Sequence, residues 1–121
     1  MFEALVVDYA GTFTDAAVEA AIRAAKAKGL RTGLLSNADY IPPGLPPLFD
    51  AVVVSGEVGF GKPDRRIYEL VARQLGVSTE HCVYVDDVRA YVRGAVDAGM
   101  TGVHHTAEES TVEELAVLLG L

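Results

Sequence analysis

Side chains that suit metal and phosphate binding stand at several separated points in this sequence. They are Asp8, Ser36, Asn37, Lys62, Asp86 and Asp87. Carboxylates that converge on one point repel each other, and a hard cation such as Mg²⁺, which prefers oxygen ligands, removes that conflict. A lysine and a hydroxyl beside them would complete a site of the size of a phosphate group. The ordered set therefore predicts one shared site, if the fold brings its members together.

The first of these residues, Asp8, follows an apolar run (residues 4–7) that is typical of a buried strand. Gly11 and Thr12 come soon after it, so the chain must turn there with its amides exposed around the carboxylate. An aspartate in this position needs a cation, hydrogen bonds or a substrate to offset its desolvation. The alternative interpretation is that Asp8 only caps the following turn.

Apolar runs and helical periods alternate along the rest of the chain. The expected strands are residues 4–7, 30–35, 51–54, 81–85 and 101–105, and the expected helices are residues 16–28, 63–75, 89–98 and 111–119. This alternation predicts an α/β fold: a Rossmann-like three-layer α/β/α sandwich with a central parallel sheet of about five strands. Since ligands bind at the carboxyl ends of such strands, the chemical residues should share one rim.

Local signals refine the expected helices and loops. Asp15 is expected to cap the first helix, and Ser110 the last one, with Glu113 completing a capping box. The helix over residues 89–98 is expected to bury Tyr91, Val92, Ala95 and Val96. Two segments are expected to be loops: residues 41–48, which hold four prolines, and residues 55–62, which hold three glycines.

Composition narrows the class of protein. The net charge of −7 argues against nucleic-acid and anionic-membrane partners, which need a basic surface. A single cysteine, Cys82, excludes an internal disulfide and fits a reducing compartment. No apolar run reaches the length of a membrane span, and residues 1–3 lead directly into a strand. We expect a soluble, cytoplasmic protein with a single domain over residues 1–121.

Four short motifs make the chain resemble the haloacid dehalogenase (HAD) superfamily over nearly its whole length. In order, they are Asp8-Tyr9-Ala10-Gly11-Thr12, Leu35-Ser36-Asn37, Gly61-Lys62-Pro63-Asp64 and Val85-Asp86-Asp87. The resemblance implies that Asp8 is a nucleophile that forms an aspartyl intermediate, which water then hydrolyses. It also implies Mg²⁺ as the cofactor and a small phosphorylated substrate.

The resemblance assigns a role to each remaining residue. The metal would be held by Asp8, the main-chain carbonyl of Ala10 and Asp87, with Asp86 binding it directly or through water. Ser36 and the neighbouring amides would grip the phosphoryl group, and Lys62 would neutralise charge on it. The substrate-binding set implied in this way is Gly11, Thr12, Ser36, Asn37 and Lys62.

Two departures from the family pattern bear on activity. The phosphatases of the family have a second aspartate where this chain has Ala10, and a methyl group cannot transfer a proton. Phosphonoacetaldehyde hydrolases carry a similar Asp-x-Ala-Gly-Thr motif but depend on a Schiff-base lysine from a cap domain. Here the expected elements fill residues 9–35 and 37–61, so no cap domain fits between the motifs. The site should be open to water.

The leading hypothesis is a weak Mg²⁺-dependent phosphate-ester hydrolase. The alternative is a catalytically silent HAD-like module that binds phosphate or a protein. A metal-independent dehalogenase is disfavoured because Asp86 and Asp87 would form an unneeded repulsive pair, and a receiver domain is rejected because it pairs aspartates at its first strand. We also expect a homodimer in which Ile41, Leu45 and Leu48, exposed on the proline-rich loop, shield the rim. His104 and His105 are expected to be ordinary strand-end residues.

Overall fold

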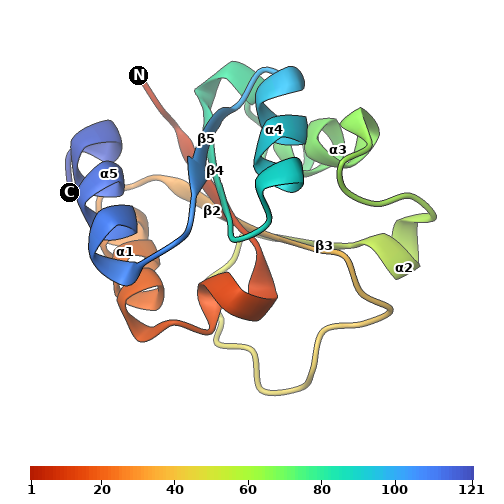
Figure 1. The fold of residues 1–121 in the computed structure, drawn as a ribbon, viewed down its shortest axis with the longest axis horizontal. Helices are drawn as coiled ribbons and strands as arrows, with labels where there is room; N and C mark the ends of the chain where they lie inside the picture. Colours follow the sequence, from red (N-terminus) through yellow and green to blue (C-terminus); the bar gives the residue numbers. More distant parts are fainter.

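The computed structural model describes residues 1–121 and has a five-stranded parallel sheet at its centre (Figure 1). The strands are β1 (Ala4–Val7), β2 (Arg31–Ser36), β3 (Ala51–Val54), β4 (Cys82–Asp86) and β5 (Thr101–His104). Their order in the sheet is β3-β2-β1-β4-β5, so β1 lies at the middle. The predicted fold class is therefore confirmed.

The register of the sheet aligns the strand ends that carry the chemical residues. Val7 in β1 pairs with Leu34 in β2 and with Val85 in β4. One residue further along, Asp8 and Asp86 therefore leave the sheet at the same level, and Ser36 ends the neighbouring strand β2. The strands predicted at residues 30–35 and 81–85 are both present, and each is shifted by one residue toward the C-terminus.

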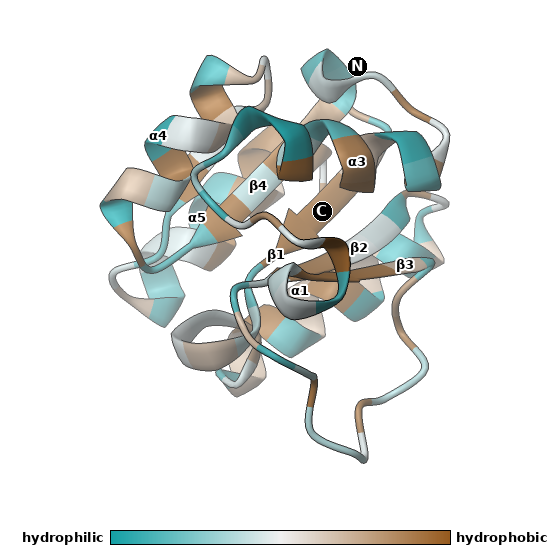
Figure 2. Cartoon of the chain, turned by 90° about the vertical axis from the view of Figure 1, so that its right-hand side faces the viewer, coloured by the Kyte–Doolittle hydropathy of each residue, from teal (hydrophilic) through white to brown (hydrophobic).

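Helices cover both faces of the sheet (Figure 1). They are α1 (Ala16–Ala27), α2 (Ser55–Val58), α3 (Arg65–Leu75), α4 (Arg89–Asp97) and α5 (Glu108–Leu119). Because side chains alternate along a strand, Leu5 and Val7 face α1 and α5, whereas Ala4 and Val6 face α3 and α4. Most of the apolar residues in the strands are buried between the two helical layers, as expected for a sheet covered on both faces (Figure 2).

Several local predictions were wrong, each for a physical reason. Residues 55–58 form the short helix α2, although their glycine content predicted a loop. Helix α3 begins at Arg65, because the Asp64 carboxylate caps it by accepting from the main-chain N–H of Arg66. Helix α5 begins at Glu108, not after Ser110; the Ser110 hydroxyl instead donates to the Ala107 carbonyl.

Two burial predictions were also wrong. Of the four residues expected to be buried in α4, only Ala95 is, while Tyr91 and Val92 are half-buried and Val96 is 52% exposed. The helix instead places Gly94 against Pro63 and Tyr68. On the proline-rich loop, Leu48 is buried, and Ile41 and Leu45 pack against the core cluster beneath α1. The exposed apolar surface that suggested a homodimer is thus largely absent, and the homodimer stays an untested prediction.

Two further findings concern the helices and the single cysteine. None of the helices is long and apolar enough to cross a membrane. Cys82 is a free, buried thiol in β4, and burial raises its pKa to about 11. A thiol of this kind is a small core residue and a poor nucleophile at neutral pH.

Candidate active site

Lys62 lies at the centre of a buried polar network at the carboxyl end of the sheet. Its ammonium nitrogen Nζ is 2.8 Å from Asp8 Oδ1 and 2.9 Å from Asp86 Oδ2, and its side chain is only 1% exposed. Nζ also donates to the Leu35 carbonyl (3.1 Å) and to the Tyr84 hydroxyl (2.9 Å). A buried lysine with this many acceptors is held as a fixed positive charge beside Asp8.

The main chain of Lys62 is fixed by Asn37, which follows β2. The Asn37 side chain accepts from the Lys62 N–H (2.8 Å) and donates to the Lys62 carbonyl (3.0 Å). Asn37 was predicted to bind substrate, but in the structure its amide orients the lysine. Gly61 leaves room for this pairing, since a Cβ there would lie 2.8 Å from Asn37 Oδ1.

The adjacent residues Asp86 and Asp87 have opposite surroundings. Asp86 is fully buried: Oδ2 accepts from Tyr84 and Lys62, and Oδ1 accepts from the Val88 N–H at 2.9 Å. Asp87 is exposed, beside the turn that holds Gly11. Asp87 is therefore free to bind a cation, whereas Asp86 has most of its acceptor capacity occupied.

Asp8 is only 8% exposed, and this burial has an electrostatic consequence. Burial raises the pKa of Asp8 to about 6, although the ammonium of Lys62 acts in the opposite direction. The Asp86 carboxylate adds to the increase. One lysine therefore does not fully offset the burial of Asp8 and the nearby Asp86 charge, and a further positive charge would favour the ionised form of Asp8.

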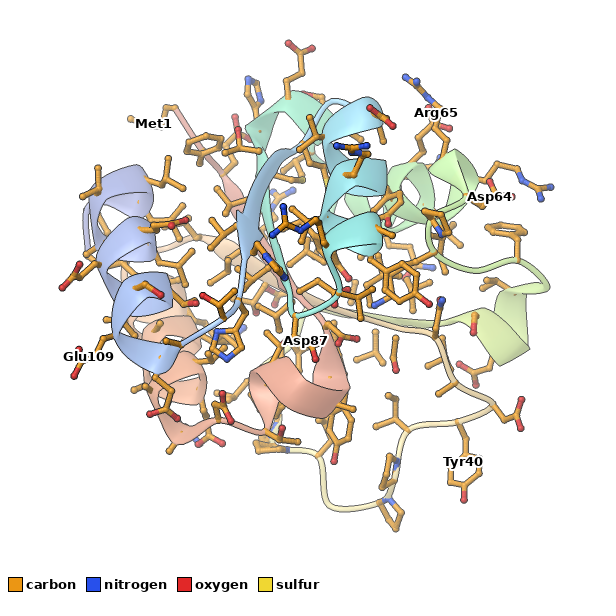
Figure 3. All side chains as sticks on the ribbon, viewed as in Figure 1. Met1, Tyr40, Asp64, Arg65, Asp87 and Glu109 are labelled. Carbon is orange, nitrogen blue, oxygen red and sulfur yellow. The ribbon has the colours of Figure 1, made fainter.

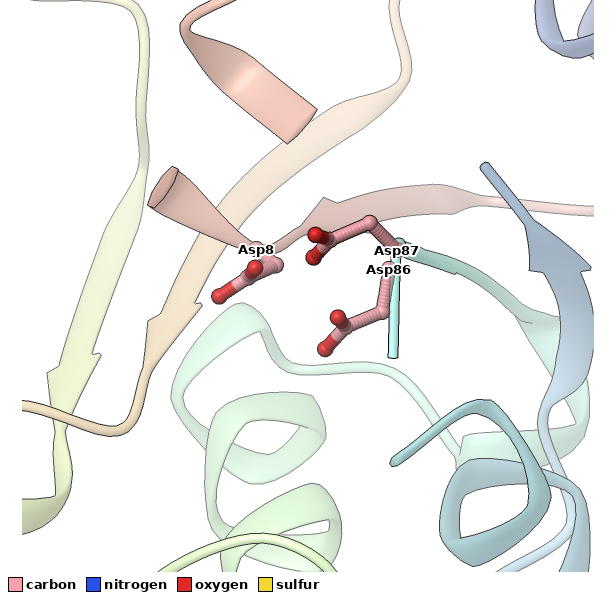
Figure 4. Close-up of side chains that lie close together, drawn as sticks. All are labelled: Asp8, Asp86 and Asp87. Atoms are coloured by element: carbon pink, nitrogen blue, oxygen red, sulfur yellow. The ribbon is translucent and has the colours of Figure 1, made fainter. Parts of the chain in front are cut away.

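Asp8, Asp86 and Asp87 each place a carboxylate oxygen within 4.8 Å of the other two (Figure 4). The turn after β1 is built to admit the third carboxylate: Gly11 has φ +77°, and a Cβ at this position would lie 2.5 Å from Asp87 Oδ2. An all-oxygen donor set with surplus negative charge suits Mg²⁺. The residues present thus fit the predicted metal.

The remaining predicted site residues, for metal or substrate, differ in accessibility. Ala10 and Gly11 are exposed in the turn η1 (Tyr9–Phe13), whereas Ser36 is only 6% exposed at the end of β2. Thr12 is fully buried, and its hydroxyl has no hydrogen-bond partner. A contact from Thr12 to a substrate would therefore come from its main chain, and its role in substrate binding stays a prediction.

No inserted domain lies over this rim. Residues 9–35 form η1, α1 and β2, and residues 37–61 form the proline-rich loop, β3 and α2. Asp87 lies at the centre of the rim, and Tyr40, which is 70% exposed, stands away from it on the loop (Figure 3). The predicted absence of a cap between the motifs is confirmed.

Sequence reasoning missed three residues with polar roles near the rim. Tyr84 contacts Lys62 and Asp86, and the ring of Tyr91 lies 5.0 Å from Lys62 Nζ. His105 lies directly after β5, close to its expected place at the strand end, but it is also buried and hydrogen-bonded to Asp15 and Thr111, which the sequence did not indicate. Because side chains alternate along a strand, the sequence of β4 could have predicted that Tyr84 lies on the same face as Asp86. No nearby residue indicated the contacts of His105.

A family model described as haloacid dehalogenase-like hydrolase matches residues 3–99. The chain belongs to this family. A phosphatase of Mycobacterium tuberculosis (strain CDC 1551 / Oshkosh), MT3486, is 38% identical over 88 residues, which cover 66% of this chain and 41% of the relative. A glyceraldehyde 3-phosphate phosphatase of Methanothermobacter thermautotrophicus is 36% identical over 96 residues, which cover 73% of this chain and 42% of the relative. The HAD-like chain thus spans less than half of either relative.

A solved structure of similar length shares the whole fold. It is an uncharacterized protein from Corynebacterium glutamicum, 32% identical, with a TM-score of 0.91, and the match covers 100% of this chain and 97% of that one. A HAD phosphatase from Thermococcus onnurineus has a TM-score of 0.74 at 24% identity, covering 88% of this chain and 58% of that one. The second likeness shows the fold alone.

Proposed function

We propose that this HAD-like chain is a Mg²⁺-dependent hydrolase of phosphate esters in which Asp8 is the nucleophile. The observation that carries the proposal is the environment of Asp8: a nearly buried carboxylate, 2.8 Å from a buried ammonium, at a strand end beside two further carboxylates. An isolated turn cap would need neither the lysine nor the second and third carboxylates. This arrangement supports covalent catalysis by Asp8.

In the first step, an Asp8 oxygen attacks phosphorus and the bond to the ester oxygen breaks, which leaves an aspartyl phosphate. Lys62 stabilises the charge on Asp8 and on the phosphoryl oxygens, and Ser36 donates a hydrogen bond to that group. Water then attacks phosphorus, releases inorganic phosphate and regenerates the carboxylate. Mg²⁺, held by Asp8, Asp87 and the Ala10 carbonyl, would offset the negative charge that the phosphoryl group brings.

Asp86 has a different role in this proposal. Since three donors already occupy its oxygens, Asp86 orients Lys62 and reaches the cation at most through water. Ala10 limits the reaction, because no side chain at that position can protonate the leaving oxygen or activate water. The loss of general acid–base help typically costs about 10²–10⁴-fold in rate, so we expect weak activity that favours aryl over alkyl esters.

The relatives support a small phosphorylated substrate. Their names include glyceraldehyde 3-phosphate phosphatase and, in Thermus thermophilus, phosphoserine phosphatase, which is 37% identical over 93 residues. A Bacteroides thetaiotaomicron HAD family enzyme of the same fold, 17% identical, was solved in complex with magnesium and inorganic phosphate. We extend a small-ester substrate and Mg²⁺ to this chain as parts of the proposal.

The test is hydrolysis of p-nitrophenyl phosphate with Mg²⁺, with EDTA, and by the Asp8→Asn variant. The good leaving group of this ester needs no general acid, so wild type should turn it over with Mg²⁺ only. Asp8→Asn should reduce kcat/KM by about 10³-fold or more, because the nucleophile is lost. Equal turnover by the two proteins would refute Asp8 as nucleophile.

A second function, a silent phosphate-binding module, is favoured by Ala10 alone. It predicts that wild type binds Mg²⁺ and inorganic phosphate by calorimetry but turns over no ester. Mg²⁺-dependent turnover that disappears in Asp8→Asn excludes this module.

A further inference from the structure

We propose that Tyr84 is a positioning residue of this active site. The Tyr84 hydroxyl and the Lys62 ammonium both donate to the Asp86 carboxylate, and this arrangement keeps the ammonium in contact with Asp8. The inference concerns the arrangement of the lysine, and its effect on catalysis rests on the proposed function. None of the four sequence motifs includes Tyr84. It stands two residues before Asp86 in β4 and points to the same face of the sheet.

The Tyr84 hydroxyl closes a ring of three hydrogen bonds. It accepts from Lys62 Nζ at 2.9 Å and donates to Asp86 Oδ2 at 2.5 Å. Lys62 and Asp86 also contact each other directly at 2.9 Å. The hydroxyl is therefore used both as donor and as acceptor between two opposite charges that are almost completely buried.

The tyrosine ring is itself immobilised. Tyr84 is fully buried and packs edge-on against Tyr68, with ring centroids 5.6 Å apart and an interplanar angle of 80°. The Tyr68 hydroxyl in turn donates to the Tyr91 carbonyl at 2.6 Å. A hydroxyl on such a fixed ring can hold its partners in place, because the side chain has no other rotamer to adopt.

The competition for the ammonium explains why this hydroxyl matters. Lys62 Nζ has three protons and lies between two carboxylates, those of Asp8 and Asp86. Asp86 Oδ2 already accepts one hydrogen bond from the lysine, and the Tyr84 hydroxyl donates a second one to the same oxygen, which reduces the pull of Asp86 on the ammonium. Without that hydroxyl, the ammonium should move toward the more deeply buried Asp86 and leave Asp8 and the phosphoryl oxygens less well neutralised.

The matched experiment compares Tyr84→Phe with Tyr68→Phe. Each substitution removes one buried hydroxyl and keeps the ring, so Tyr68→Phe retains the edge-on contact with Tyr84. The Tyr68 hydroxyl bonds only to the Tyr91 carbonyl, whereas the Tyr84 hydroxyl bonds to Lys62 and Asp86. Tyr84→Phe should lower kcat for p-nitrophenyl phosphate by about 10–100-fold and change KM by less than about threefold, as expected for an indirect support of a charged group. Tyr68→Phe should leave both constants within about twofold, although both variants lose stability.

A readout that needs no turnover keeps the inference separate from the proposed function. The chain has three lysines, and Lys26 and Lys28 are far less buried than Lys62, so slowly exchanging ammonium protons in ¹⁵N NMR should report Lys62 alone. We expect this signal in wild type and Tyr68→Phe, and its loss or displacement in Tyr84→Phe. An unchanged signal, or an equal kcat loss in both variants, would overturn the inference. Absence of turnover in wild type would refute the proposed function, and the ammonium signal would still decide the position of Lys62.

Discussion

Two buried polar networks occupy neighbouring parts of the molecule and differ in their charge. The rim network joins Lys62 to Asp8 and Asp86 at the ends of β1 and β4. The flank network joins His105, just after β5, to Asp15 before α1 and Thr111 in α5, with both distances 2.6 Å. Both networks connect distant segments of the chain, but only the rim network brings more than one carboxylate together.

The difference indicates which network is built for a ligand. With Asp87, the rim gathers three carboxylates around one ammonium, whereas the flank pairs one carboxylate with one imidazole and one hydroxyl. A balanced buried network completes its own hydrogen bonds and holds elements together. A network with surplus charge is costly until something neutralises it, which is typical of functional sites. The predictions below test this contrast.

The largest expected effect follows from Lys62→Met, which keeps the length of the side chain and removes its charge. Asp8 and Asp86 would then face each other without a cation, so the free energy of unfolding should fall by about 3–5 kcal/mol. Urea denaturation measures the loss. The control is Lys26→Met, because Lys26 forms a half-exposed pair with Asp50 at 3.0 Å and should cost less than about 1 kcal/mol. Equal losses in the two variants would show that the rim charge is unimportant for stability.

Ala10→Asp should give the next largest effect, now as a gain. The substitution adds a carboxyl group in the exposed turn beside the rim, where the family pattern has one. It should raise kcat/KM for an alkyl phosphate by about 10–10³-fold and for an aryl phosphate much less, because only the alkyl leaving group needs a proton. Kinetics with both esters check this. If the variant folds, binds Mg²⁺ and hydrolyses neither ester, the phosphatase proposal fails.

The contrast between the networks also marks what sequence reasoning can reach. The rim could be predicted because each of its strands is a short apolar run that ends in a polar residue, and parallel strands bring such ends together. The sheet fixes these positions with little help from side chains. Sequence reasoning missed Tyr84 and the partition of roles within the rim: Asn37 orients Lys62, and Asp86 is enclosed while Asp87 is free.

The flank network could not be predicted, because its partners are far apart in the sequence. Asp15 occupies the expected cap position of α1, but its side chain makes no capping hydrogen bond. Its carboxylate instead forms a hydrogen bond with His105, which lies 90 residues away in the sequence. Similarly, no residue near Ser110 indicates that α5 begins at Glu108, two residues before the expected cap. Local propensity gives the type of an element, whereas tertiary partners decide its ends.

His105→Ala should have a moderate effect on the free energy of unfolding and none on catalysis. It removes both hydrogen bonds and leaves the Thr111 hydroxyl buried without a partner, so the free energy of unfolding should fall by about 1–3 kcal/mol. His81→Ala is the matched control, since His81 forms a half-exposed pair with Glu3 at 3.2 Å and should cost less than about 1 kcal/mol. A kcat/KM for p-nitrophenyl phosphate that falls more than about threefold in His105→Ala would contradict a purely structural role.

The smallest expected effect, the thermal response to Mg²⁺, tests the contrast most directly. A cation that binds only the folded state stabilises it by mass action, and at tenfold above Kd the gain is about 1.4 kcal/mol, or roughly 5 °C in Tm for a domain of this size. The gain should vanish in Asp87→Ala, which removes the exposed carboxylate and leaves the buried pair with Lys62 in place. It should persist at full size in His105→Ala, because the flank network shares no residue with the carboxylate cluster and distant sites act additively. Differential scanning calorimetry of the three proteins, with and without Mg²⁺, measures this. A Mg²⁺ shift that survives Asp87→Ala would place the cation elsewhere, and a shift that disappears in His105→Ala would mean that the two networks are coupled.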